Sequence, residues 1–384
     1  MRRRALLIGI MGGLLLGGII GALRGPLARL TPPAAPLGED GGRISRVVMH
    51  YQPDAGPLAM PIYRQWLAAM RADVEVVWVA AQQADLDDLP SQLGSLWRKD
   101  HHRGVVVGKP ISTWSKDRFV AMHVPGRRNF SVSCAPARTR TANPLRTNDQ
   151  EAPYCLAQQL PQWFGVRDTT VDFDGGDFLA TAGHLFASPA IIEKNAPSAG
   201  ARFPSAAALA DYLGQQMGRP ITWVGGERAQ DAPPHHLGMF LTVIGQRAAV
   251  GDIRLAEQAG AAHAQTLTAL QAAGGEASPA FRADLQTRLD RVARQFDALG
   301  YTVVRVPLLP SATPRAWMSY NNGIVETRDG HAIFYMPTFG AAALDAEAAA
   351  TFRAQMGCTV VPIDCATIWP LGGSLHCLVN VVGR

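Results

Sequence analysis

Short apolar runs alternate along this chain with amphipathic stretches of helical length. The apolar runs predict strands at residues 45–49, 74–79, 104–107, 221–224, 241–244, 302–306, 332–336, 359–361 and 378–382. The amphipathic stretches predict helices at residues 57–72, 206–217, 253–273, 280–299 and 345–356. Short strands between isolated helices indicate an α/β fold, and this alternation alone fits a doubly wound sheet and a propeller equally well.

Two regions show neither the pattern of a strand nor that of an amphipathic helix. Residues 130–153 are rich in Arg, Thr and Asn, which predicts an irregular surface loop. Residues 169–180 predict two strand fragments around a turn at Gly175 and Gly176.

The first 30 residues differ from the rest of the chain. Arginines at positions 2–4 precede an uncharged apolar run at residues 5–23, the pattern of an export signal or a membrane anchor. As a helix this run would reach roughly 28 Å, about one hydrocarbon thickness. We predict a leader at residues 1–30, a flexible Pro- and Gly-rich linker at 31–42 and one folded domain at 43–384. The domain is expected to be exported, either released or tethered to the inner membrane.

Composition and charge narrow the class of protein. The chain has 384 residues, 47% hydrophobic and 17% charged, enough to bury a large core in one or two domains. Residues 1–30 hold five of the 36 basic residues and no acidic one, so the remainder has 31 basic and 31 acidic residues. A neutral body without basic runs argues against a nucleic acid as partner.

The five cysteines are an odd number for an exported chain, so at least one is free or pairs with another molecule. Cys134 and Cys155 are placed to close the 130–153 loop with a disulfide. Cys358 and Cys365 would lie roughly 23 Å apart in a straight strand, too far to be bridged.

The fifth cysteine, Cys377, follows a Gly-Gly turn and precedes the last predicted strand. We expect a thiol at a sharply turned strand edge that a small substrate can approach. A buried structural cysteine is equally consistent with this local pattern.

Four further stretches, together with this closing segment, appear in the order of the motifs of one family. They are Ser115-Lys116-Asp117, Asp174-Gly175-Gly176-Asp177, His236-Leu237-Gly238 and Ser319-Tyr320-Asn321-Asn322, followed by Gly372-Gly373-Ser374-Leu375-His376-Cys377. Together they resemble the motifs of the guanidino-group-modifying superfamily, which includes agmatine deiminase and the bacterial peptidylarginine deiminases. The resemblance implies the five-bladed α/β propeller called the pentein, with its site on the central axis.

The chemistry of that superfamily calls for these residue types. A guanidinium is planar and always charged, so carboxylates that match its N–H fork are needed to orient it, the role implied for Asp117 and Asp174. The resemblance makes Cys377 the nucleophile, which attacks as a thiolate, and His236 the acid and base. The resemblance implies a catalytic role for Asp174 as well as for Cys377 and His236. Further substrate contacts are expected from Trp114, Asp177 and Asn322, and the reaction needs no metal or cofactor.

The chain departs from the family pattern in one place of consequence. Gly238 stands where the family has a second substrate carboxylate, and glycine cannot hold a guanidinium nitrogen. Either the substrate is bound through fewer contacts, or the charge comes from another acid, the candidates being Asp172, Asp177 and Asp231. One of His235 and His236 is expected only to pack, and His376 is expected to be a framework donor.

We therefore predict a hydrolase that converts a guanidino group to a ureido group with release of ammonia. Export favours arginine in peptides or proteins as the substrate, and agmatine is the alternative. A guanidine-binding protein that lost turnover because of Gly238 is a second class of function. A thiol redox protein, in which Cys377 pairs with Cys365 or Cys358, is a third.

Overall fold

The computed structural model describes residues 34–384 apart from 128, 140, 196–202, 259–262 and 314. The predicted leader, residues 1–30, lies outside the described residues. Within the described residues, no helix combines the length and the apolar character that a membrane crossing requires.

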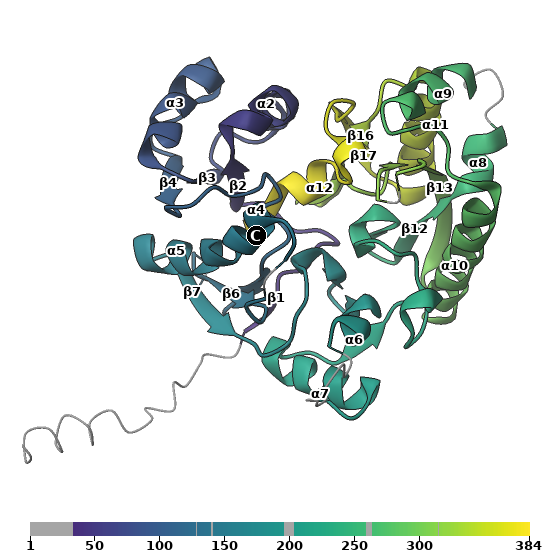
Figure 1. The fold of residues 1–384 in the computed structure, drawn as a ribbon, viewed down its shortest axis with the longest axis horizontal. Coiled ribbons are helices and arrows are strands. Elements are labelled where there is room, and N and C mark those ends of the chain that lie inside the picture. Colours follow the sequence, from purple (N-terminus) through teal and green to yellow (C-terminus); the bar gives the residue numbers. More distant parts are fainter. Residues whose placement is uncertain (1–33, 128, 140, 196–202, 259–262, 314) are drawn as a thin grey trace, which may run out of the picture.

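Five small sheets stand around a central axis in the described part of the chain (Figure 1). Their strand orders are β18-β2-β3-β4, β1-β5-β6-β7, β10-β9-β8, β11-β12-β13-β14 and β15-β16-β17. The strands are β1 (Ala35–Pro36), β2 (Arg46–Tyr51), β3 (Glu75–Ala80), β4 (His102–Val106), β5 (Val120–His123), β6 (Ser131–Ala135), β7 (Phe164–Asp168), β8 (Phe178–Ala180), β9 (Leu185–Ala187), β10 (Ile221–Trp223), β11 (Leu241–Ile244), β12 (Arg247–Asp252), β13 (Thr302–Pro310), β14 (Trp317–Ser319), β15 (Ile324–Arg328), β16 (His331–Thr338), β17 (Thr359–Asp364) and β18 (Val379–Gly383).

Every sheet repeats the same connection. A strand pairs antiparallel with its neighbour, as β11 does with β12, and a helical crossover then leads to a parallel strand on the other side, as from β12 to β13. The same rule holds for four further sets of three strands: β5–β6–β7, β8–β9–β10, β15–β16–β17 and β18–β2–β3. The fold is therefore a ring of five ββαβ units, although the sequence has no repeat that is visible by eye.

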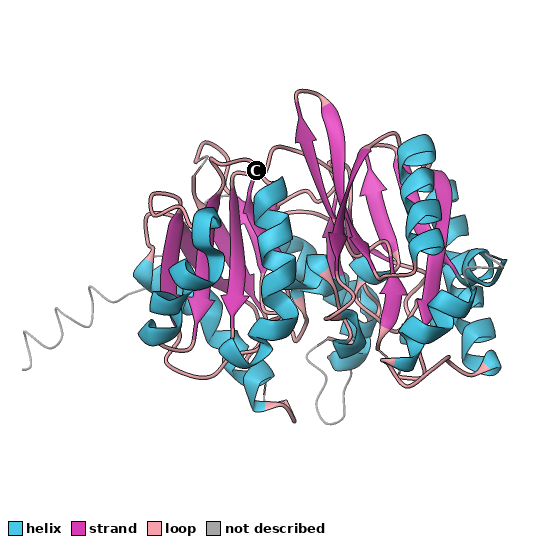
Figure 2. Ribbon diagram, turned by 90° about the horizontal axis from the view of Figure 1, so that it is seen from above, coloured by secondary structure: helices cyan, strands magenta, loops and turns pink. Residues whose placement is uncertain are grey.

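Most helices cover the outer faces of the sheets, whereas α4 and α12 lie near the centre of the ring (Figures 1 and 2). The helices are α2 (Gly56–Ala69), α3 (Gln83–Leu93), α4 (Pro144–Asn148), α5 (Ala152–Gln159), α6 (Ala190–Lys194), α7 (Ala206–Met217), α8 (Ile253–Gln258), α9 (His263–Gln271), α10 (Pro279–Ala298), α11 (Ala342–Thr351) and α12 (Leu375–Leu378). Helix α10 illustrates their packing, because its buried residues Leu285, Leu289, Val292 and Phe296 recur at helical spacing on one face.

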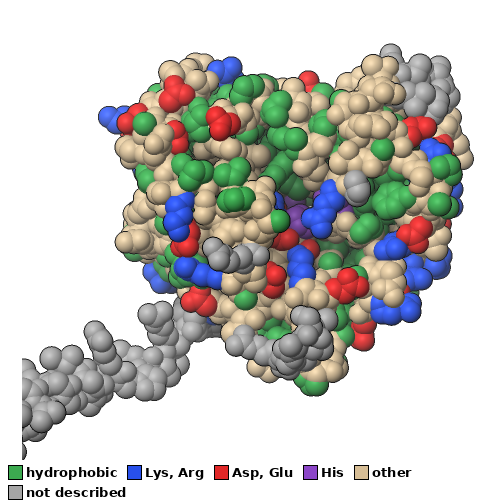
Figure 3. Space-filling view, in the orientation of Figure 1, with side chains coloured by type: hydrophobic (Ala, Val, Ile, Leu, Met, Phe, Trp, Pro, Cys, Tyr) green, Lys and Arg blue, Asp and Glu red, His purple; other side chains and the backbone are tan. Residues whose placement is uncertain are grey.

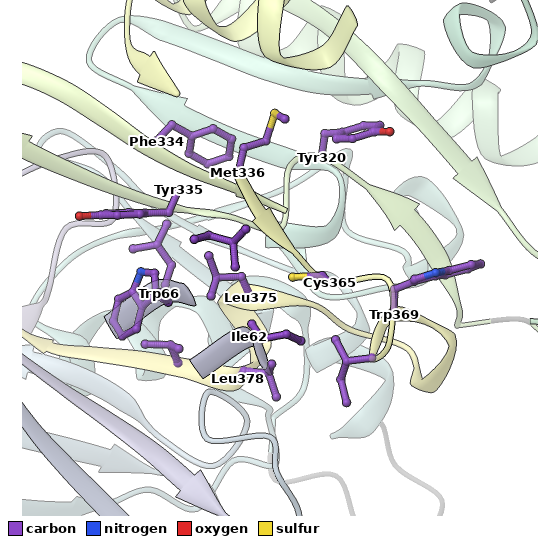
Figure 4. Close-up of a cluster of buried hydrophobic side chains, with 14 of the residues drawn as sticks. Ile62, Trp66, Tyr320, Phe334, Tyr335, Met336, Cys365, Trp369, Leu375 and Leu378 are labelled. Atoms are coloured by element: carbon purple, nitrogen blue, oxygen red, sulfur yellow. The ribbon is translucent and has the colours of Figure 1, made fainter. Parts of the chain in front are cut away.

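The end of the chain closes the ring. Strand β18 pairs antiparallel with β2, with Val379 opposite Met49, so the C-terminus completes the first sheet. The preceding turn is fixed by Leu375 and Leu378, which are fully buried in the largest apolar cluster with Cys365 and Trp369 (Figure 4). Cys377, which lies between these two leucines, is thereby held at the junction of several sheets.

The segment predicted as a flexible linker is folded onto the domain from residue 34 onward. Strand β1 pairs antiparallel with β5, with Ala35 opposite His123. Beyond β1, the Glu39 N–H donates to the Ala180 carbonyl at 2.7 Å. We call residues 34–42 the strap. Their Pro and Gly content predicts a spacer, but their backbone forms hydrogen bonds with two sheets.

Several predicted elements differ in the structure. Residues 131–135, predicted as loop, form β6, which is buried along its whole length and therefore lacks the alternation that identifies a half-buried strand. Residues 169–173 are not a strand, and the strand before them, β7, belongs to a different sheet from β8. The helix predicted at 253–273 is two helices, α8 and α9.

All five cysteines are free thiols in the structure, so the predicted Cys134–Cys155 disulfide is absent. Cys134 on β6 packs into an apolar cluster with Val132, whereas Cys155 on α5 packs against the cluster on the opposite face of that sheet, with Phe164. The two side chains therefore point away from each other. Cys377 likewise makes no disulfide with Cys365 or Cys358.

Candidate active site

A cavity of about 300 Å³ opens near the centre of one face of the ring, where histidine, basic and acidic side chains gather around a hollow (Figure 3). Its walls include Cys377, His236, Asp117, Asp174 and Trp114. These residues come from four separate stretches of the chain, each of which the sequence singled out.

Cys377 lies on the one-turn helix α12 just before β18, not at a strand edge as predicted. Gly372 has φ +95°, a conformation that glycine adopts without strain. A Cβ on Gly373 would lie 2.9 Å from the Trp114 ring and 3.1 Å from the Cys377 sulfur. Because residue 373 has no side chain, the Trp114 indole and the Cys377 thiol can both lie close to its backbone.

Asn322 supports this turn and does not line the cavity. It is fully buried, and its Oδ1 accepts hydrogen bonds from the Ser374 N–H at 3.0 Å and from the Ser374 hydroxyl at 2.9 Å. Its own carbonyl accepts from the His376 N–H at 3.0 Å. The structure therefore gives Asn322 a place behind the nucleophile instead of the substrate contact predicted for it.

Asp117 is held by hydrogen bonds from two directions. The loop that carries it is tied to the C-terminal segment, because the Lys116 N–H donates to the Cys377 carbonyl at 3.3 Å and the Ser115 hydroxyl donates to the Leu378 carbonyl at 2.8 Å. The Asp117 carbonyl accepts from the Gly175 N–H at 2.7 Å. These bonds connect the first predicted motif directly to the last one.

The Asp-Gly-Gly-Asp stretch forms a 3₁₀ turn whose glycines are required by close approaches. A Cβ on Gly175 would lie 2.2 Å from the Lys116 carbonyl oxygen, and one on Gly176 would lie 2.6 Å from the His236 ring. The Asp177 carboxylate accepts from the Asp174 N–H at 2.9 Å and binds Lys194 at 2.6 Å. Asp177 thus stabilises the turn, and it lines a neighbouring cavity instead of the cavity of Cys377.

His236 stands between the two carboxylates. Its Nδ1 is 3.8 Å from Asp117 Oδ1, and its Nε2 is 3.6 Å from Asp174 Oδ2. Burial alone would lower the pKa of His236, but Asp174, the Cys377 thiol and Asp117 favour its charged form and raise the pKa to about 10. Burial would raise the pKa of Asp174, but His236 and Lys194 hold it well below its usual range.

The adjacent His235 differs from His236 in every respect that matters for catalysis. Burial and the neighbouring charge of His236 lower the pKa of His235 to about 3, so it is neutral at physiological pH. It packs edge-on against Trp317 with ring centroids 4.9 Å apart, and its Nδ1 accepts the His236 N–H at 2.8 Å. His235 is the packing member of the pair.

The cavity also contains cations that the sequence analysis missed. The Arg146 guanidinium, on α4, binds Asp117 Oδ2 and lies 3.5 Å from Asp174 Oδ1. Arg118 lies 3.4 Å from the same Asp174 oxygen, and Lys194 binds the other oxygen at 3.0 Å. Arg146 belongs to the stretch predicted as an irregular surface loop, whose unusual arginine content was the only signal in the sequence.

One oxygen of Asp117 makes no hydrogen bond with a described residue, although the His236 imidazole lies 3.8 Å from it. This oxygen, Oδ1, is buried and has no hydrogen-bond partner among the described residues. A buried carboxylate oxygen without a donor is costly, which is the environment expected of an atom that receives a donor from a ligand.

Gly238 is buried and faces away from this cavity. A Cβ at Gly238 would lie 3.0 Å from His376 Nδ1 and 3.5 Å from Asn322 Nδ2. Of the acids considered as substitutes for a carboxylate at 238, Asp231 binds Arg228 and Arg291, and neither it nor Asp172 lines the cavity. The described residues contain no group of three or more ligating side chains suited to a metal ion.

A second cavity, of about 370 Å³, adjoins the first. The two share Asp174, His235, His236 and Arg315 in their walls. The thiol and imidazole therefore lie at one end of a space that extends well beyond a single guanidino group.

A ring of five ββαβ sheets around a central site that combines a thiol, an imidazole and two carboxylates is the pentein architecture that the motifs predict. Residues 261–381, which include Asn322 and Cys377, match the sequence model of the family described as Porphyromonas-type peptidyl-arginine deiminase. No curated protein sequence gives a significant match to this chain.

Solved structures with a similar fold include two agmatine deiminases and a putative arginine deiminase. Agmatine deiminase from C. jejuni is 13% identical, with a TM-score of 0.63, and the match covers 91% of this chain and 96% of that one. Agmatine deiminase of Enterococcus faecalis is 14% identical, with a TM-score of 0.62 and coverage of 92% and 96%. A putative arginine deiminase from Porphyromonas gingivalis is 15% identical, with a TM-score of 0.62 and coverage of 90% and 97%.

The structural likeness confirms the predicted pentein fold. The family match over residues 261–381 agrees with the predicted deiminase class.

Proposed function

We propose that this protein hydrolyses the guanidino group of an arginyl peptide or protein to a ureido group, using Cys377 as the nucleophile. The observation that carries the proposal is the guanidinium of Arg146 between Asp117 and Asp174, in the cavity that also holds Cys377 and His236. The carboxylate pair thus already binds the chemical group on which the enzyme would act, and Asp117 Oδ1 still lacks a donor.

The electrostatics of the site support a thiolate mechanism. With a pKa of about 10, His236 is a cation at neutral pH, so it can act as the proton donor beside Cys377. The thiolate attacks the guanidinium carbon, and a carbon–sulfur bond forms. His236 gives its proton to the departing ammonia, so that a thiouronium remains on the sulfur.

The second half of the reaction reverses the roles. The now neutral His236 takes a proton from water, and the hydroxide adds to the thiouronium carbon. The carbon–sulfur bond then breaks and the hydroxyl proton of the intermediate passes to solvent, where the released ammonia takes it up. This releases the neutral ureido product and restores the thiolate and the imidazolium. The sum is one guanidinium and one water converted to one ureido group and one ammonium.

The combined volume of the two adjoining cavities supports a peptide substrate. Adjoining spaces of about 300 and 370 Å³ are more than a guanidino group and a short alkyl chain fill. The predicted leader supports it as well, because an exported enzyme would meet arginine in proteins and peptides. We propose that residues 1–30 direct export and that residues 5–23 anchor the protein if the leader is retained.

Agmatine is the second candidate substrate, favoured by the fold of the agmatine deiminases that resemble this chain. Agmatine lacks the carboxyl group of arginine. A panel of agmatine, free arginine and peptides with internal or terminal arginine separates the candidates by the rate of ammonia release.

The same assay tests the chemistry. Cys377→Ala is expected to abolish ammonia release from every substrate, because no other described thiol lines the cavity. Cys155→Ala is the matched control, since this thiol is half-buried on α5 and is expected to leave turnover unchanged. Saturable binding of a guanidine without product in the unsubstituted protein would indicate the binding protein instead.

A further inference from the structure

Three ionisable side chains form a partly buried cluster near the centre of the ring, outside the cavity of Cys377. Glu39 Oε1 binds Lys116 Nζ at 2.6 Å, and Glu39 Oε2 binds His376 Nε2 at 2.7 Å. The side chain of Lys116 is 8% exposed and that of His376 is 14% exposed. One carboxylate thus uses one oxygen for each of two partners that are 77 and 337 residues away.

Both partners directly precede residues of the proposed active site. Lys116 is followed by Asp117, and His376 is followed by Cys377. The two backbones are also joined by the bond from the Lys116 N–H to the Cys377 carbonyl, at 3.3 Å. Glu39 therefore connects the segment that carries Cys377 to the segment that carries Asp117, on the side away from the cavity.

Glu39 itself is held in place by the strap. Its N–H donates to the Ala180 carbonyl, and the Leu37 N–H donates to the Ala121 carbonyl at 2.9 Å. One residue further, the Asp40 carboxylate accepts from the Ala182 N–H at 2.9 Å. The carboxylate of Glu39 thus projects inward from a backbone that two sheets fix.

His376 depends on this carboxylate because of Gly238. The imidazole presents Nε2 to Glu39, whereas a Cβ at Gly238 would lie 3.0 Å from Nδ1. Glycine offers no side-chain acceptor on the Nδ1 side. Glu39 is the acidic partner of this imidazole in the described part of the chain.

The carboxylate is ionised in this environment. Burial alone would raise the pKa of Glu39, but Lys116 and His376 lower it to about 2. Arg384, which interacts electrostatically with Glu39, Asp40 and Glu326, also lies near the cluster. Removing one partner of such a buried pair leaves the other charge uncompensated.

We propose that Glu39 is a positioning residue that fixes Cys377 relative to Asp117 through His376 and Lys116. This inference rests on the proposed function, because it concerns the geometry of the same reaction. A displacement of about 1 Å in a nucleophile can reduce a rate by about 100-fold.

The test compares Glu39→Gln with Asp40→Asn, a matched amide substitution one residue away. Asp40 touches neither partner, and the oxygen of an asparagine amide can still accept the Ala182 N–H. We expect Glu39→Gln to lower kcat by about 100-fold and Asp40→Asn to leave kcat unchanged. The rate and pH profile of Cys377 alkylation by iodoacetamide, followed by mass spectrometry of its peptide, are expected to change in Glu39→Gln alone.

A second variant separates positioning from stability. Glu39→Gln with Lys116→Met removes the unpaired buried cation, so the melting temperature should recover while kcat stays low, because His376 is still unsupported. Recovery of kcat together with the melting temperature would overturn the positioning role. So would a Glu39→Gln protein with the original kcat and alkylation profile.

The two proposals fail in different ways. If the unsubstituted protein releases no ammonia from any guanidine, the proposed function fails, and the alkylation profile of Cys377 still decides the role of Glu39. If the unsubstituted protein turns over and Glu39→Gln matches it in both readouts, only the inference about Glu39 fails.

Discussion

Arg146 occupies the space between Asp117 and Asp174 that the guanidinium of a substrate would need. Asp117, Asp174 and Asp177 are matched by Arg118, Arg146 and Lys194, and the Cys377 thiolate would be matched by protonated His236. Arg315 also lines the cavity, so a substrate guanidinium would add to an excess of positive charge. Substrate therefore has to exchange with a cation, and Arg146 is the one carried by a five-residue helix within a long connection.

Arg146→Gln is accordingly expected to tighten the binding of agmatine by about 10-fold, because a tethered competitor has been removed. The measurement is the Kd of agmatine in the Cys377→Ser background, which separates binding from turnover. Arg138→Gln is the control, since Arg138 lies in the same connection and binds Glu151 near the surface. Weaker binding of agmatine in Arg146→Gln would contradict the exchange.

The raised pKa of His236 makes both turnover and stability depend on alkaline pH. The folded-state pKa of about 10 lies above the ordinary value of 6.5, so the folded protein retains a proton that the unfolded chain gives up. The resulting stabilisation is fully present below pH 6.5 and is lost as the pH rises through about 10. Turnover should fall over the upper part of the same range, because neutral His236 cannot protonate the departing ammonia.

Urea unfolding of the original protein and of His236→Gln, measured between pH 6.5 and 10, checks this expectation. The difference in the free energy of unfolding between the two proteins should shrink steadily toward pH 10. A difference that does not change with pH would show that His236 carries no shifted proton.

At the scale of elements, the Asp-Gly-Gly-Asp turn sets the position of the imidazole. Gly176→Ala would bring a methyl group to within 2.6 Å of the His236 ring, so the ring or the turn must move. We expect a fall in kcat of about 100-fold with a folded protein, measured by ammonia release and thermal unfolding.

Gly183→Ala is the control for that substitution, because nothing lies within 4 Å of a Cβ at position 183. It should leave both the rate and the melting temperature unchanged. An active Gly176→Ala protein would mean that the turn yields without moving His236.

The elements also show what local sequence can predict. Helix α7 and strand β11 match the predicted bounds, because α7 has a Ser205 cap and a Gly218 stop and β11 is a clean apolar run. Strand β6 was missed because Ser131 and Ser133 lie on a buried face, where the Ser131 hydroxyl donates to the Val382 carbonyl. A polar residue satisfied by a distant carbonyl has no local signature.

At the scale of the whole molecule, the sequence motifs located the residues around the cavity but not their supports. Cys377, His236, Asp117 and Asp174 meet as expected. Arg146 and Glu39 were missed because each acquires its role only through contacts with segments that lie far away along the chain. The strap was read as a spacer because Pro and Gly signal irregular backbone without revealing its partners.

Because the strap is part of the fold, the folded domain begins near residue 34 and not at residue 43. A recombinant version that starts at residue 43, where composition places the domain boundary, would lack β1 and Glu39, whereas one that starts at residue 34 keeps both. In the cell, a processing protease that trims the chain between these two points would remove part of the support behind the nucleophile while leaving every residue of the cavity wall in the product.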